Sequence, residues 1–209
     1  PFAPSRSSTV ERSSTQDGVR QLIRIPQFWL VALAYGALTG FFGAWGAMLG
    51  PNMQAVLAKD DAETQGGWIG FWGALAGMPA GVILSLGADR LGHKKPLLLM
   101  CCGGAAIGFF CFSLLCSGAF DLSSSARLAL MYATSILGSL FANAVVPLYY
   151  ELAVETTFPV AEGLTTGALT LMNNVGCLVF LLVQSAPVGD RQSFVYQHAM
   201  HHFLLRFLL

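Results

Sequence analysis

Asparagine side chains inside long apolar stretches are the most distinctive chemistry of this sequence. Asn143, Asn173 and Asn174 each lie at least eight residues from the nearest Asp, Glu, Lys or Arg. A carboxamide donates and accepts hydrogen bonds, so it can hold a polar molecule or bridge two helices. Leaving such a group buried without a partner costs about 2–7 kcal/mol. These side chains must therefore face another polar helix surface or a water-filled cavity.

Hydroxyl groups recur at helical spacing around these asparagines. Members of a first series are three, four, four and seven residues apart, so they share one helix face. A second series and a shorter aromatic and polar patch show similar spacing. The first series is Tyr132, Ser135, Ser139, Asn143 and Tyr150; the second is Thr166, Thr170, Asn173, Cys177 and Gln184; the patch is Tyr35, Thr39 and Phe42.

These faces have two open interpretations, which are hydrogen bonding between packed helices and the wall of a cavity. For Ser135 and Ser139 neither is favoured. Asn173 and Asn174 are adjacent, and two neighbouring carboxamides are hard to satisfy at one packed interface. We therefore favour a cavity for the asparagines.

The helices that position these groups are long enough to cross a membrane. The 209-residue chain is 55% hydrophobic and 11% charged, with a mean hydropathy of +0.61. Soluble domains have about 25% charged residues, and a membrane helix needs about 20 apolar residues. Five intervals meet that need, so we predict an all-α integral membrane protein. The spans are about residues 26–49, 66–88, 97–120, 128–150 and 164–186.

The charged segments predict the orientation of the spans. Arg90, Lys94 and Lys95 lie in a short loop between the second and third spans, which predicts that this loop is cytoplasmic. The acidic loop at residues 59–63 then lies on the opposite side, and the loop at residues 151–163 on the cytoplasmic side.

The two ends of the chain differ from the spans in composition. Residues 1–24 are rich in Ser, Thr and Arg and predict a disordered cytoplasmic segment. Residues 187–209 form an atypical tail whose last apolar piece is too short to span a bilayer.

Two motifs resemble a known transporter family. The first resembles the cytoplasmic signature of the major facilitator superfamily and is Asp89-Arg90-Leu91-Gly92-His93-Lys94-Lys95, with Ser85 in place of the usual leading Gly. The second, at residues 150–167, resembles solute carrier family 49 and contains Glu-x-x-x-Glu-x-Thr-aromatic-Pro-x-x-Glu-Gly. Residues 67–72 are most similar to the renal carcinoma type of that family, which is related to the feline leukaemia virus receptor-type heme and choline transporters.

The resemblance implies that the five spans are helices seven to eleven of a twelve-helix fold. The chain would then be most of the C-terminal half, and its missing N-terminal six-helix half would be a partner. The implied activity is secondary transport of a small organic solute, heme-, choline- or vitamin-like, by alternating access. The resemblance leaves the lysosomal and plasma membranes open, with a slight preference for the lysosome.

The resemblance also implies roles for particular residues. Helices seven, ten and eleven would line the solute cavity, and five positions on them are expected to bind solute. A second group would form a conformational latch on the cytoplasmic side; the alternative for its basic part is a loop that only sets topology. The solute-binding positions are Tyr35, Thr39, Asn143, Asn173 and Asn174, and the latch positions are Asp89, Arg90, Gly92, Lys94, Glu151 and Glu155.

Other functions fit the sequence less well. A non-transporting, membrane-embedded fragment or a scaffold protein is the main alternative. The sequence has no pairing of a nucleophile with a base and no Gly-rich phosphate loop, so we expect no enzyme and no cofactor. His198, His201 and His202 have no supporting carboxylates, so we expect no metal site. The expected partners are the lipid bilayer, the solute and the missing half, and no nucleic acid.

Overall fold

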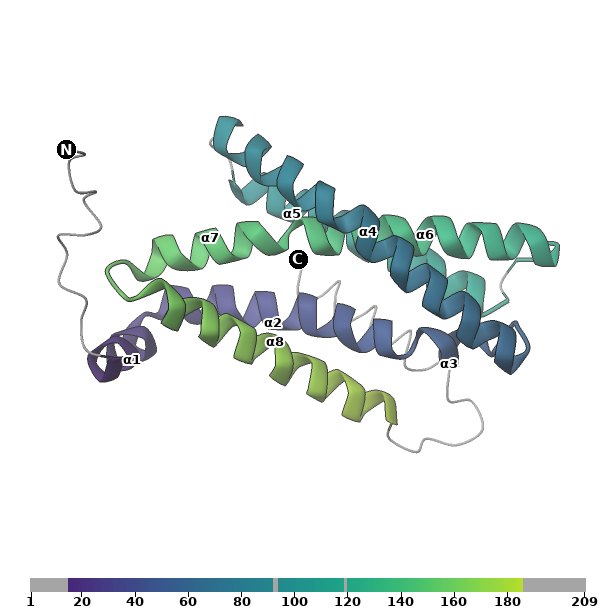
Figure 1. Cartoon of the computed structure of the whole chain (residues 1–209), viewed down its shortest axis with the longest axis horizontal. Coiled ribbons are helices and arrows are strands. Elements are labelled where there is room, and N and C mark those ends of the chain that lie inside the picture. Colours follow the sequence, from purple (N-terminus) through teal and green to yellow (C-terminus); the bar gives the residue numbers. More distant parts are fainter. Residues whose placement is uncertain (1–14, 92–93, 119, 186–209) are drawn as a thin grey trace, which may run out of the picture.

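The computed structural model describes residues 15–91, 94–118 and 120–185, and within them the chain is helical with short connections (Figure 1). No strand occurs in these described ranges. The helices are α1 (Thr15–Arg24), α2 (Pro26–Ala47), α3 (Leu49–Met53), α4 (Lys59–Leu91), α5 (Lys94–Cys116), α6 (Ser124–Ala144), α7 (Val146–Thr157) and α8 (Glu162–Ser185).

Five membrane-length segments confirm the prediction of an all-α membrane protein. Among the described residues, five helical segments are long and apolar enough to cross a bilayer. They are Pro26–Ala47, Lys59–Ala88, Pro96–Cys116, Ser124–Thr157 and Glu162–Val183. The fourth segment joins α6 and α7, which are interrupted at Val145; Pro147 in the first turn of α7 has no amide hydrogen to donate to the preceding turn.

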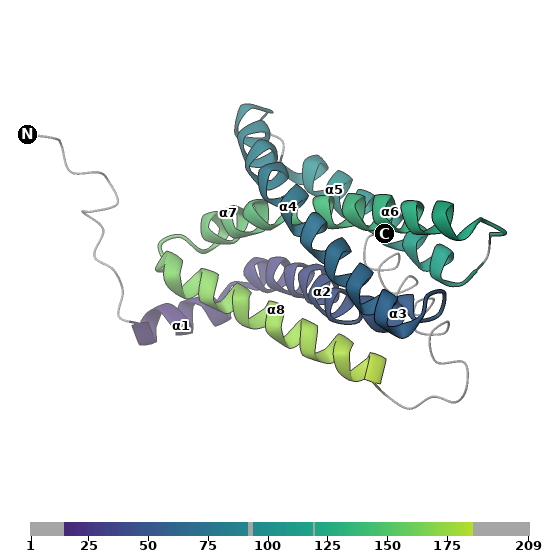
Figure 2. The same cartoon turned by 45° about the vertical axis from the view of Figure 1, so that its right-hand side comes forward.

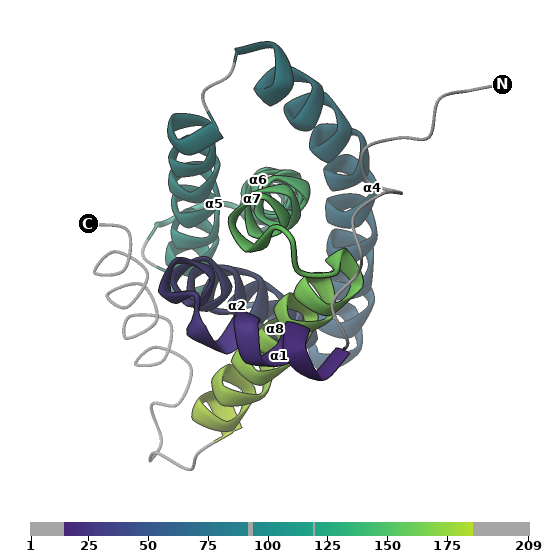
Figure 3. The same cartoon turned by 90° about the vertical axis from the view of Figure 1, so that its left-hand side faces the viewer.

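The helices form a bundle around α6 and α7. Viewed along the long axis, α4 and α5 lie on either side of α6, and α2 and α8 cover α7 (Figure 3). α8 lies against α2 in both side views (Figure 1, Figure 2). One end holds α1 and the α7–α8 turn, and we name it the α1 end; the opposite end holds α3 and is named the α3 end.

Two core clusters fill the bundle. Near the α3 end, Phe41, Trp45 and Phe112 are buried together between α2 and α5. Near the α1 end, Phe28 and Leu169 join α2 to α8. The bundle therefore has a packed core at both ends, and the core near α3 contains Phe41, Trp45 and Phe112.

Glycines let two helix pairs approach closely. A Cβ at Gly40 of α2 would lie 2.6 Å from the Cys177 amide nitrogen of α8. On α4, a Cβ at Gly73 would lie 2.8 Å from the Ser139 side chain, and one at Gly77 would lie 2.5 Å from the Asn143 Cβ. Small residues commonly form such membrane-helix contacts because they let the backbones approach. These contacts position Ser139 and Asn143 against α4.

The structure corrects two expectations about the N-terminal part. Residues 15–24 were expected to be disordered, but they form α1, because Leu22 is 5% exposed and packs into the core near Phe28. Residues 59–63 were expected to be a loop, but they form the first turn of α4. The negative charges of Asp60 and Asp61 stabilise this turn by interacting with the positive end of the helix dipole. The expectations for residues 1–14 and 187–209 lie outside the described residues.

Candidate functional site

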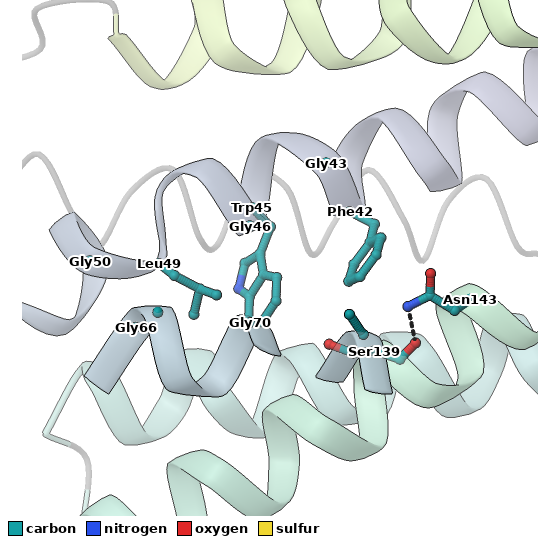
Figure 4. A pocket seen from close by; sticks show the side chains of 12 residues that line it. Phe42, Gly43, Trp45, Gly46, Leu49, Gly50, Gly66, Gly70, Ser139 and Asn143 are labelled. Carbon is teal, nitrogen blue, oxygen red and sulfur yellow. Dashed lines mark hydrogen bonds between the residues drawn. The ribbon is translucent and has the colours of Figure 1, made fainter. Parts of the chain in front are cut away.

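A cavity of about 370 Å³ lies between α2, α3, α4 and α6 toward the α3 end. Figure 4 shows the rings of Phe42 and Trp45 pointing from α2 toward α4 and α6. The cavity is lined by Phe42, Gly43, Trp45, Gly46, Leu49, Gly50, Gly66, Gly67, Gly70, Ala74, Ser139 and Asn143. The lining therefore combines aromatic rings, exposed backbone at glycines and two polar side chains.

Phe42 and Trp45 form the aromatic wall of the cavity, and side chains of α5 pack against this wall. The Trp45 ring lies 4.5 Å from the Phe109 ring and 5.4 Å from the Phe112 ring, measured between centroids. The Phe42 and Trp45 rings are stacked, with an interplanar angle of 19° and a centroid distance of 6.1 Å. Contacts of this kind contribute stabilising free energy beyond that of burying the rings, and they favour particular ring orientations. The α5 side chains thus fix the ring that faces the cavity.

The polar wall comes from one face of α6. The Asn143 Nδ2 donates a hydrogen bond to the Ser139 carbonyl oxygen, one turn earlier, at 2.9 Å (Figure 4). Among the residues that the structure describes, the Asn143 side-chain oxygen has no hydrogen-bond partner. A partly buried acceptor of this kind is available to a hydroxyl or ammonium donor that enters the cavity.

Among the described residues that line the cavity there is no Asp, Glu, Lys, Arg or His. A charged solute would therefore have no oppositely charged side chain here. Aromatic faces attract organic cations through their quadrupole and also bind neutral rings. The lining suits a small neutral molecule or an organic cation better than an anion.

A second polar cluster links α2, α7 and α8 nearer the α1 end. The Tyr35 hydroxyl donates to the Tyr150 hydroxyl at 3.4 Å, and the Tyr150 and Thr170 hydroxyls are 3.2 Å apart. The Tyr35 ring makes edge-to-face contacts with Tyr149 and Tyr150, both with centroids 5.5 Å apart. Thr39 donates to the Tyr35 carbonyl oxygen at 2.7 Å. We call Tyr35, Thr39, Tyr150 and Thr170 the hydroxyl cluster.

The predicted solute-binding residues occupy three places. Asn143 lines the cavity, Tyr35 and Thr39 lie buried in the hydroxyl cluster, and α8 presents the other two. Asn173 is half-buried and Asn174 is exposed on α8, outside the cavity lining. The structure thus joins Asn143 to an aromatic wall but does not gather all five residues around one space.

Sequence reasoning missed the principal aromatic group of the cavity. Trp45 was not among the expected site residues, because an aromatic residue in an apolar span usually indicates packing. Phe42 belonged to the polar and aromatic patch but was not assigned to the site. The available signal was the pair Phe42 and Trp45, three residues apart and each followed by a glycine.

The latch residues are only partly described. Gly92 and the side chains of Asp89, Arg90 and Lys94 lie outside the described residues. Glu151 is half-buried and Glu155 exposed. Both lie on α7, which ends at the α1 end of the bundle (Figure 1). This is also the end at which α4 ends and α5 begins (Figure 1). The latch remains a prediction.

Metal ligands do not cluster in the part of the chain that the structure describes. No group of three or more His, Cys, Asp or Glu side chains is arranged there to hold an ion. The cysteines of the spans, including Cys101 and Cys116, are free thiols, and both of these are buried.

Comparisons with known proteins find relatives that are named as solute carriers and transporters. A solute carrier family 49 member 4 homolog of Xenopus tropicalis is 32% identical over 187 residues, which are 87% of this chain and 39% of that protein. The chain is a homologue of solute carrier family 49. The choline/ethanolamine transporter FLVCR1 of Mus musculus is 27% identical over 199 residues, which are 92% of this chain and 34% of that protein. The choline/ethanolamine transporter FLVCR2 of Homo sapiens is 25% identical over 195 residues, 90% of this chain and 35% of that protein.

Solute carrier family 49 is the family that the two sequence motifs indicated, so that resemblance is confirmed. No family model matches the chain. The chain spans about two fifths of the length of the Xenopus relative. The relatives are named as transporters and solute carriers rather than enzymes.

Proposed function

We propose that this solute carrier family 49 homologue forms one half of a membrane transporter that moves a small organic solute by alternating access. The observation that supports this most is the cavity between membrane spans, with Trp45 and Phe42 on one wall and Asn143 on another. Solute sites of such transporters lie between two helical halves that move about the site. The five spans then correspond to the C-terminal half.

The open faces of two helices support a missing second half. In the apolar 18-residue stretch of α4 only 22% is buried, and in that of α8 only 6% is buried. The exposed face of α8 includes Thr170 and Asn174, and a polar surface facing lipid is costly. A second six-helix half covering α4 and α8 would surround these groups with protein and water, so it is the proposed partner.

The cavity favours a small solute. Its volume of about 370 Å³ lies near the lower end of the roughly 300–1,000 Å³ of ligand pockets. Choline and ethanolamine, which two relatives are named for, are small and carry an ammonium group that aromatic faces attract. We therefore place a choline-like or vitamin-like solute ahead of heme.

Aromatic and polar groups have separate roles in this proposal. Trp45 and Phe42 hold the solute through its apolar or cationic part, and the Asn143 oxygen accepts a hydrogen bond from it. Asn173 and Asn174 extend the path along α8 toward the other half. The hydroxyl cluster ties α2 and α8 to α7, so Tyr35 and Thr39 act by positioning these helices.

The basic turn between α4 and α5 is proposed as a conformational latch. Asp89, Arg90 and Lys94 would pair with charged groups at the α1 end, where α7, the helix that carries Glu151 and Glu155, also ends. Such pairs bias a two-state equilibrium without touching solute. Replacing Asp89 with Ala is expected to slow uptake while solute affinity is retained; lost affinity with an unchanged transport rate would contradict the latch.

Uptake by the complete gene product tests the function. Proteoliposomes are supplied with labelled choline, ethanolamine, heme and vitamin-like solutes. We expect saturable uptake of a small solute, reduced about fivefold to thirtyfold by Trp45→Ala and less by Trp45→Phe, because an aromatic face contributes about 1–2 kcal/mol to holding a cation. Ile107→Ala, on the exposed side of α5, a helix that the second half is not proposed to cover, is the matched control and should transport normally.

The alternative is a membrane-embedded protein that does not transport. Failure of every solute to enter the proteoliposomes, with the protein folded, would favour that alternative. Imaging of a tagged gene product then decides between the lysosomal membrane, which we favour, and the plasma membrane.

A further inference from the structure

α1 is an amphipathic helix with one face on the bundle and another turned outward. Gly18 and Leu22 are buried against the bundle. Val19 and Ile23, one turn apart, are 40% and 61% exposed. Isolated exposed apolar residues are ordinary, but two on one face of a ten-residue helix form a patch.

Two arginines flank that patch. Arg20 and Arg24 each follow an apolar residue by one position, which places them about 100° further round the helix. Both are exposed. The outward surface of α1 thus has an apolar strip, Val19 and Ile23. This strip is bordered by Arg20, Arg24 and the exposed Asp17, which together carry a net positive charge.

The position of α1 relative to the bilayer is fixed by the span that follows. Ile25 alone separates α1 from α2, the first membrane span. The Trp29 indole nitrogen, in the first turns of α2, donates to the Ile23 carbonyl oxygen at 3.2 Å. Tryptophan is enriched at the level of lipid headgroups. Leu30 is already 71% exposed, so lipid contact begins one residue later.

The direction of α1 also fits a membrane surface. Figure 3 looks along the bundle, so that α6 and α7 appear end-on while α1 is seen from the side, across the ends of α2 and α8. A helix at headgroup depth that runs across the spans lies in the plane of the membrane. Apolar residues beside Lys or Arg in that position are typical of helices that lie in the lipid interface.

We propose that α1 binds the anionic phospholipid surface of the leaflet in which α2 begins. Val19 and Ile23 insert among the upper acyl chains, and Arg20 and Arg24 contact lipid phosphates. Leu22 joins the core cluster that contains Phe28 and Leu169, so lipid engaged by α1 acts on the positions of α2 and α8. The inference holds whether or not the cavity binds a solute.

Hydrogen exchange in nanodiscs tests this binding. The complete gene product is placed in nanodiscs of phosphatidylcholine alone or with 30% phosphatidylserine, and exchange of the α1 amides is measured by mass spectrometry. We expect slower exchange with phosphatidylserine, by about fivefold for each arginine that contacts the anionic surface. Arg20→Gln with Arg24→Gln should abolish the difference, and Val19→Ser with Ile23→Ser should speed exchange in both lipids.

Gln21→Ala is the matched control, since Gln21 is exposed on the same helix away from the apolar strip. It should keep the full lipid effect. Equal exchange of the α1 amides in the two lipids would overturn the proposal and indicate that protein, not lipid, covers this face. A lipid effect that survives loss of both arginines would overturn it as well.

Discussion

Replacing Gly77 with Ala tests the close approach of α4 to the polar face of α6. A Cβ at position 77 would lie 2.5 Å from the Asn143 Cβ and 2.8 Å from its Nδ2, well inside ordinary contact. Overpacking of this kind costs about 1–3 kcal/mol. The change from Gly to Ala in a helix interior offsets about 1 kcal/mol of that cost.

Gly67→Ala is the matched control, because it lies on the same helix and nothing lies within 4 Å of its added Cβ. The helix-propensity gain is common to both variants. Gly77→Ala should therefore be less stable than Gly67→Ala by the overpacking term alone, about 1–3 kcal/mol, or roughly fivefold to over a hundredfold in the unfolding constant.

Unfolding by SDS in mixed micelles, followed by tryptophan fluorescence, measures this difference. A double-mutant cycle adds Asn143→Gly, which removes the Cβ that collides with position 77. The cycle should give a coupling of at least about 1 kcal/mol, since the two sites are in contact. Equal stability of Gly77→Ala and Gly67→Ala, with no coupling, would refute the reasoning that α4 glycines position Asn143.

Three further substitutions test the packing. Ser135→Ala should leave the free energy of unfolding unchanged or raise it by about 1 kcal/mol, because the Ser135 hydroxyl is buried without a partner among the described residues. A decrease of more than about 1 kcal/mol in SDS unfolding would show that this hydroxyl makes a stabilising hydrogen bond. Gly40→Val should separate α2 from α8 and lower the unfolding midpoint, whereas Gly46→Val, with no atom near its Cβ, should not; equal midpoints would count against the α2–α8 contact. Tyr150→Phe removes two hydroxyl contacts and should cost about 0.6–1.7 kcal/mol, as membrane hydrogen bonds do; no loss would mean that the hydroxyl cluster contributes nothing to stability.

The membrane spans could be predicted because charge is absent from stretches longer than a bilayer is thick. The polar face of α6 could also be predicted, since Ser139 and Asn143 are one turn apart. The four-residue spacing of Gly73 and Gly77 on α4 is typical of close contact with another helix, but it does not identify that helix. Local spacing is sufficient for these features because each depends on a single helix.

Other features depend on contacts between distant segments. Residues 15–24 read as polar and disordered, but burial of Leu22 against the core stabilises α1. Tyr35 was expected in the cavity, yet its ring is enclosed by Tyr149 and Tyr150 from a helix more than a hundred residues away. Trp45 reads as core in an apolar span, and only the gap between α2, α4 and α6 shows that its ring also faces a cavity.

Water access to the polar positions is the most direct test of a solute path. Single cysteines replace Asn143, Asn174 or Ile107 in a cysteine-free complete gene product, and a membrane-impermeant, charged thiol reagent is added to proteoliposomes from each side. Ile107 is 64% exposed on α5, outside the proposed path. The reagent should label positions 143 and 174, choline or another transported solute should slow labelling at 143, and position 107 should stay unlabelled. Positions 143 and 174 that are as unreactive as position 107 from both sides would contradict the solute path.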